Sequence, residues 1–171
     1  MNIVDKILVD PITRGLKFFT KGGVPAYVSQ VRGRTDGSAP AAGDVGETVQ
    51  GIRTSGGGIG LTSNVFADVT SVLLTAGHWR LDGLVGQATG GTTTNSSAAI
   101  SINSGNTTTD HAYGNNASSG NIPTTANDGG VPIPGYIVNI TSSTTYYLKA
   151  TQTFSSGSPV AYGRLIATRL P

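Results

Sequence analysis

The chain has 171 residues, of which 37% are hydrophobic and 12% charged, and its 11 basic and 9 acidic side chains nearly balance. This length suits one ordinary domain plus an arm, and the abundance of Gly, Ser, Thr and Asn favours short strands and many turns. The net charge of +2 gives no indication of nucleic-acid binding, the lack of cysteine excludes disulfides and Cys-based zinc sites, and no apolar stretch approaches the roughly 18 residues of a membrane span.

Residues 1–30 form a mixed, moderately apolar arm that carries most of the basic surplus. Its first residues, MNIVDKILVD, have acids inside the apolar run and no small-residue cleavage site, so we do not expect a signal peptide. The stretch NIVDKIL favours one short helical turn. Exposed apolar segments usually mark interfaces, and we expect the arm to attach the protein to a partner through Leu16, Phe18, Phe19, Val24 and Tyr27.

A linker is predicted over residues 31–46, VRGRTDGSAPAAGDVG, which are rich in Gly, Ala, Pro and Asp and have no hydrophobic period. Residues 47–171 follow as a β-domain. Ala67 to Leu74 alternates well enough for a strand, and Thr75, Ala76 and Gly77 form its turn. In the next strand Trp79, Leu81, Gly83 and Val85 share the inward face, opposite His78, Arg80, Asp82 and Leu84.

The last two strands, TTYYLKATQTF and VAYGRLIATRL, give the strongest pattern in the chain. In the first of them Tyr146, Leu148, Ala150 and Phe154 share one face. No window carries helical periodicity over several turns. These patterns predict an all-β fold, an antiparallel β-sandwich of about eight short strands with jelly-roll-like topology behind the extended arm. The predicted core residues are Trp79, Leu81, Val85, Tyr146, Leu148 and Phe154.

Gly90 to Gly130 is dominated by Thr, Asn, Ser and Gly. Apart from one strand at SAAISI, this composition predicts a long polar loop. Aromatic rings stack on sugar faces while amides and hydroxyls bind sugar hydroxyls. This mixture therefore suits weak carbohydrate contact, with a solubilising loop as the alternative. The candidate receptor loop comprises Asp110, His111, Tyr113, Asn115, Asn116 and Tyr136.

Three patterns resemble chemical sites. His78, Arg80 and Asp82 form an acid–base set without a nucleophile, and a solvated or subunit-facing strip is the favoured interpretation. Asp110 and His111 are too few to bind a metal within one chain, although copies of His111 could meet on a trimer axis. The stretch SGGGIG lacks the Lys-Ser/Thr of a phosphate loop and favours a turn. We therefore predict no catalytic residues, no metal and no cofactor.

The series VTSVLLTAGHWRLDGLVG and YYLKATQTFSSGSPVAYGRLIATRL resembles a β-sandwich head domain at the ends of tailed-bacteriophage fibre and virion-surface proteins. In that family an LTAG turn leads into an aromatic-bearing strand, and the chain closes with an AYG-type strand ending in Arg. The matching elements here are Leu74 to Gly77, Trp79, Tyr146, Tyr147, Phe154, Ala161 to Gly163, and Arg169. His78 and the single terminal Arg depart from the pattern.

The resemblance implies a homotrimeric bacteriophage virion protein, in first place a short tail fibre held on the particle by its arm, with an outward receptor-binding head. A head fibre or capsid-decoration protein is the alternative, and a depolymerase ranks third because the β-domain carboxylates show no spacing typical of a catalytic pair. Partners would be other virion proteins and a host surface glycan, without nucleic acid or membrane insertion. Such a protein is assembled in the cytoplasm of the bacterial host.

Overall fold

The computed structural model describes residues 4–9, 16–20, 25–26, 36–88, 95–104, 116–120 and 129–171. The chain divides into two compact units, Met1–Ser38 and Ala39–Pro171. Within the described ranges the only helix is a single 3-10 turn, η1 (Ser55–Gly57), which lies in the predicted SGGGIG turn. No helix in those ranges is long and apolar enough to traverse a bilayer.

The first unit contains a small antiparallel sheet in the order β1-β2-β3. Its strands are β1 (Val4–Val9), β2 (Leu16–Thr20) and β3 (Pro25–Ala26). The expectation of a helical turn at NIVDKIL is therefore wrong, because β1 pairs with β2 from Val4 opposite Thr20 to Val9 opposite Leu16. Pairing satisfies the backbone of this β-branched stretch, which a single isolated helical turn would not.

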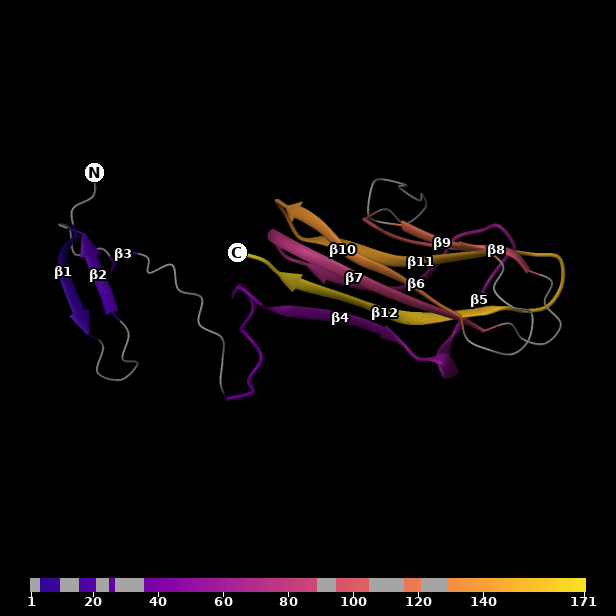
Figure 1. The fold of residues 1–171 in the computed structure, drawn as a ribbon, viewed down its shortest axis with the longest axis horizontal. Coiled ribbons are helices and arrows are strands. Elements are labelled where there is room, and N and C mark those ends of the chain that lie inside the picture. Colours follow the sequence, from indigo (N-terminus) through magenta and orange to yellow (C-terminus); the bar gives the residue numbers. More distant parts are fainter. Residues whose placement is uncertain are drawn as a thin grey trace. The chain divides into compact units, whose positions relative to one another are not determined.

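The second unit is a two-sheet β-sandwich (Figure 1). One sheet has the order β10-β7-β12-β4, with short β5 also paired to β12, and the other has the order β6-β11-β8-β9. The strands are β4 (Thr48–Arg53), β5 (Ile59–Gly60), β6 (Ala67–Leu74), β7 (Gly77–Ala88), β8 (Asn95–Asn103), β9 (Asn116–Gly120), β10 (Gly129–Ile140), β11 (Thr144–Phe154) and β12 (Val160–Arg169).

The strand order is that of a jelly roll. Four antiparallel pairs, β4 with β12, β6 with β11, β7 with β10 and β8 with β9, are the rungs of one long folded hairpin. Rolling that hairpin places β12 beside β7 in one sheet and β11 beside β8 in the other. The prediction of an all-β, jelly-roll-like sandwich is therefore confirmed.

The hydrophobic core lies between the two sheets. Of the predicted core residues, Trp79, Leu81, Val85 and Leu148 are fully buried, whereas Tyr146 and Phe154 are half-buried and pack against the core. The buried apolar side chains are Leu61, Val69, Val72, Leu74, Trp79, Leu81, Val85, Ile102, Val131, Ile133, Val138, Ile140, Leu148, Ala150, Ala161, Leu165 and Ala167.

Two strands show how far simple alternation holds. In β7, residues 79, 81, 83 and 85 are buried and residues 78, 80 and 84 are exposed, as the sequence predicts. In β11, residues 148 to 152 are all buried, so both faces are covered there. Lys149 on the outer face is only 2% exposed and forms an ion pair with Asp68. The ion pair stabilises a charge that burial alone would disfavour.

The residues just before β4 are joined to the C-terminal strand. Gly46 N donates a hydrogen bond to Arg169 O over 2.9 Å, and Arg169 N donates to Glu47 O over 2.9 Å. Residues 39–46, which belong to the predicted linker, therefore lie in the second compact unit.

Candidate functional site

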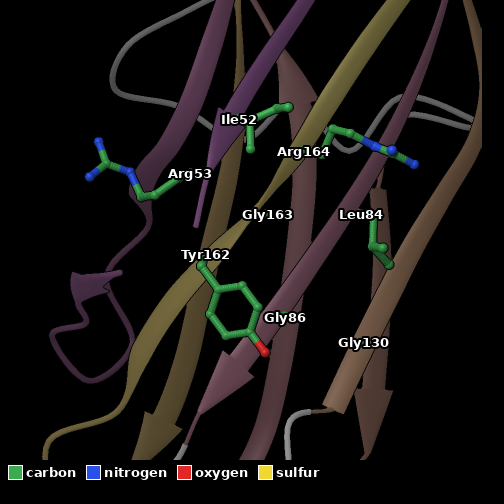
Figure 2. A pocket seen from close by; sticks show the side chains of 8 residues that line it. All are labelled: Ile52, Arg53, Leu84, Gly86, Gly130, Tyr162, Gly163 and Arg164. Atoms are coloured by element: carbon green, nitrogen blue, oxygen red, sulfur yellow. The ribbon is translucent and has the colours of Figure 1, made fainter. Parts of the chain in front are cut away.

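A groove of about 480 Å³ lies on the outer face of the β10-β7-β12-β4 sheet (Figure 2). Its walls come from four strands, so residues distant in sequence meet on one surface. Sites for small molecules are typically hollows of about 300–1,000 Å³ with apolar walls and a few polar groups. The groove is lined by Ile52, Arg53, Leu84, Gly86, Gly130, Tyr162, Gly163 and Arg164.

The register of the strands explains this composition. Tyr162 of β12 lies opposite Gly86 of β7, and Arg164 lies opposite both Leu84 and Ile52. A Cβ atom added at Gly86 would stand 2.5 Å from the ring of Tyr162. Glycine at this position therefore allows the phenol to lie across β7, as Figure 2 shows.

The two arginines of the groove differ in their surroundings. Arg53 Nε donates to Val69 O, and its Nη1 donates to Gly57 O over 3.0 Å. In Figure 2 its guanidinium points away from Tyr162. Arg164 is exposed, and within the described ranges its guanidinium has no hydrogen-bond or ion-pair partner. The groove therefore has a positive charge that is available to an anion.

In the stretch AGHWRLDGLVGQ, Arg80 and Asp82 form an ion pair on the same sheet face as this groove. Arg80 binds Asp82 through two hydrogen bonds, Nε to Oδ2 over 3.0 Å and Nη2 to Oδ1 over 3.1 Å. The same Oδ1 accepts from Gly135 N over 2.8 Å at an irregularity of β10, where Gly135 has φ +61°. The hydrogen bonds to Asp82 raise the pKa of Arg80 above its usual value. Asp82 thus holds the bulged strand, while His78 is exposed.

A second cluster forms where β12 ends. Arg169 donates from Nε to Glu47 Oε2 over 2.8 Å, from Nη1 to Ala76 O over 2.9 Å and from Nη2 to Thr75 Oγ1 over 2.6 Å. Its guanidinium also lies 4.3 Å from the ring centre of Trp79. Trp79 Nε1 in turn donates to Thr75 O over 2.9 Å. We call these five residues the Arg169 cluster.

The charge of Glu47 in the Arg169 cluster is stabilised by its contacts. Its Oε2 accepts from Gly43 N over 2.7 Å and from Arg169 Nε. The hydrogen bond from Gly43 is the largest cause that lowers the pKa of Glu47, and Arg169 lowers it further, against an opposing effect of burial. The carboxylate is therefore ionised at neutral pH and closes the ion pair.

The predicted receptor loop is not a single loop in this fold. Tyr136 lies in β10 opposite Leu81 and packs against the core, so its assignment to a loop is wrong. Burial raises the pKa of the adjacent Tyr146. Asn116 begins β9 opposite Ser101, which gives its backbone a strand partner and also corrects the loop assignment. Asp110, His111, Tyr113 and Asn115 lie outside the described residues.

The predicted attachment residues fall partly in the first unit's sheet. Leu16, Phe18 and Phe19 belong to β2, where Phe18 pairs with Ala26 and Phe19 with Pro25. Val24 and Tyr27 lie outside the described residues. Among the residues that the structure describes, no group of three or more His, Cys, Asp or Glu could hold a metal ion.

The groove was not among the sites predicted from the sequence. The available signal was the alternation of AYGRLIATRL, which places Tyr162 and Arg164 together on one face. The contribution of the glycines could not be inferred, because Gly86 and Gly130 come from strands far from β12 in the sequence. Only the sheet order brings Gly86 under the tyrosine ring and Gly130 beside Leu84.

No protein-family model matches the chain, and no curated protein matches it. Among solved structures, a subviral particle of VP2 from infectious bursal disease virus is 20% identical over 73% of this chain and 31% of that one, with a TM-score of 0.40. The Gt strain of the same virus is 16% identical over 89% and 38% of the two chains, with a TM-score of 0.47. This chain thus spans about a third of the length of those chains.

Proposed function

We propose that the protein is a bacteriophage virion structural protein, a short trimeric tail fibre whose N-terminal arm binds the particle and whose jelly-roll domain faces the host. The Arg169 cluster is the observation that carries this proposal. It joins the LTAG turn, Trp79 and the terminal arginine, which are elements on which the resemblance to virion head domains rests. These motif residues therefore share one structural purpose, the closure of the sandwich.

The carboxylates of the domain support a structural role over an enzymatic one. Asp82 pairs with Arg80, Asp68 with Lys149 and Glu47 with Arg169. A glycosidase needs two carboxylates that face one sugar bond. Each of these carboxylates has its own cation, and the pairs of Asp68 and Glu47 join separate segments of the chain, which suits a structural role.

A head fibre or capsid-decoration protein is the second candidate, because it would have the same division into an arm and a β-domain. The division of the chain after Ser38 supports both. The two candidates differ in the virion protein that binds the arm. Electron microscopy of intact particles that carry a labelled copy of this chain would distinguish tail from head.

The first prediction concerns assembly. We expect a stable homotrimer, and exposed apolar side chains outside the groove, Val65 at 51% and Leu73 at 63% exposure, provide surface for subunit contact. Light scattering should give three times the chain mass of 17.4 kDa. A monomer that persists across micromolar concentrations would contradict the trimer but would leave the arm's function open.

The second prediction concerns attachment. Deleting residues 1–38 should leave a folded domain that no longer incorporates into particles, because the second unit has its own core. Phe18→Ala with Phe19→Ala should weaken incorporation without changing the melting temperature of the second unit, because aromatic anchors dominate many interfaces. Immunoblotting of purified particles measures incorporation, and circular dichroism measures folding. Normal amounts of the truncated protein in particles would place attachment in the β-domain and favour decoration.

A further inference from the structure

The charge of the groove favours an anionic ligand. Neither Asp nor Glu is among its lining residues, while Arg53 and Arg164 are. Nε and Nη1 of Arg53 donate to backbone carbonyls, whereas Arg164 is the cation that a ligand would meet. A planar guanidinium matches the two oxygens of a carboxylate. These features favour a ligand with a planar, two-oxygen anion such as a carboxylate.

The rest of the groove suits a flat ligand with one apolar face. The phenol ring of Tyr162 packs against the backbone of Gly86. The apolar side chains of Ile52 and Leu84 are 57% and 45% exposed and provide the rest of the apolar surface. Aromatic rings provide large contact surfaces with a polar edge. Tyr162 and Arg164 are two residues apart on the same face of β12, so their Cα atoms are separated by about 6.5 to 7 Å. That spacing suits a sugar ring on Tyr162 with its carboxylate at Arg164.

The position of the groove argues against an extended peptide. Peptides that add a strand need an unpaired sheet edge. The groove lies on the face of the sheet, where β7 is paired with β10 and β12, and β12 with β7 and β4. Recognition here must come from side chains, which is how rings and carboxylates are bound.

We propose that this groove binds a carboxylate-bearing saccharide, with the sugar ring against Tyr162 and the acid group at Arg164. The inference deepens the proposed receptor-binding role and rests on it for the biological setting, whereas binding itself is a property of the second unit. A single shallow site of this kind gives weak affinity, near a millimolar dissociation constant. Several copies in one oligomer would raise the effective affinity by avidity.

The test is a titration of the purified full chain, followed by calorimetry or NMR, with a galacturonate tetramer and a sialic acid dimer. At least one should bind with a dissociation constant near a millimolar, and added salt should weaken it because an exposed ion pair is screened. The methyl ester of the bound saccharide keeps the ring and removes the charge. It should bind roughly tenfold more weakly.

Two pairs of variants separate the contribution of the Arg164 charge from that of the Tyr162 ring. Arg164→Ala should weaken binding roughly tenfold. Arg80→Gln, an equal change of charge on the same sheet face, should leave it unchanged. Gly86→Ala should also abolish most binding without changing charge, because its Cβ would displace the flexible end of Tyr162. Gly60→Ala is the matched control, since a Cβ there would meet nothing within 4 Å.

Several results would overturn the proposal. Binding of at least one of the two saccharides is required, and failure of both to bind well above the millimolar range would overturn the proposal. Equal binding of the acid and its ester, or an unchanged affinity in Arg164→Ala, would also do so. Binding of a glutamate tetrapeptide in place of both saccharides would assign the groove to an acidic protein partner. An altered oligomeric mass in Arg164→Ala would assign it to a subunit contact. Particle incorporation tests the proposed function separately, so the two failures are distinguishable.

Discussion

Replacing Trp79 with alanine should lower the free energy of unfolding by about 3 to 5 kcal/mol, the usual cost of removing a buried aromatic side chain. Trp79 is fully buried on the inner face of β7. The variant also loses the hydrogen bond from Trp79 Nε1 to Thr75 O and the contact of the ring with Arg169. Equilibrium urea denaturation at one fixed protein concentration measures the change, because an oligomer's stability depends on concentration.

Leu84→Ala is the control for Trp79→Ala on the same strand. Leu84 lies on the outer face of β7 and is 45% exposed, so its truncation should change stability by about 0.5 kcal/mol or less. Trp79→Phe should lower the free energy of unfolding by less than Trp79→Ala does, because phenylalanine keeps part of the ring volume. It still loses the indole N–H donor. Equal effects of Trp79→Ala and Leu84→Ala would show that the tryptophan is not a core residue.

Strands with one buried face and one solvent-exposed face were the most predictable part of the fold. The sequence interpretation places a strand from Ala67 to Leu74, and β6 has these bounds. In β7 the inward positions of Trp79 and Leu81 follow from alternation alone. Alternation works there because one side of the strand faces the core and the other faces solvent.

The polar half of the chain was much less predictable. β9 consists of small and polar residues, NASSG, which carry no hydrophobic period. β10 contains Pro132 and Pro134, which usually argue against a strand interior. The structure accommodates them at the edge of its sheet, near an irregularity where Gly135 has a positive φ and Asp82 accepts its N–H. Tyr136 therefore lies in a strand although its surroundings resemble a loop.

The Arg169 cluster shows why a charge can be buried against expectation. A terminal arginine in a polar sequence is usually exposed, yet Arg169 is only 8% exposed. Its partner Glu47 lies 122 residues earlier in the chain. No local pattern links the two residues, and only the pairing of β12 with β4 brings them together.

Arg169→Ala should lower the free energy of unfolding by about 3 kcal/mol, the low end of the cost of breaking a buried ion pair, because it leaves the Glu47 carboxylate, whose side chain is 13% exposed, without its cation. It also removes the donors to Ala76 O and Thr75 Oγ1, which tie the β6–β7 turn to the end of β12. Arg164→Ala is the matched control, because it removes the same side chain from the same strand at an exposed position. That variant should change stability by about 0.5 kcal/mol or less, and urea denaturation of both measures the difference.

The contacts of Glu47, first the hydrogen bond from Gly43 N and then the ion pair with Arg169, should make stability depend on pH. The pKa of Glu47 in the folded protein lies below its ordinary value of 4.5, so its contribution is fully present above about pH 4.5. It is lost as the pH falls through the lower folded value, when the carboxylate binds a proton and the pair is broken. Glu47→Gln should therefore be less stable than the natural chain at neutral pH and should lose less stability on acidification. If Arg169→Ala kept the full acid sensitivity of the natural chain and unfolded no more easily than Arg164→Ala, the cluster would not be what closes the sandwich.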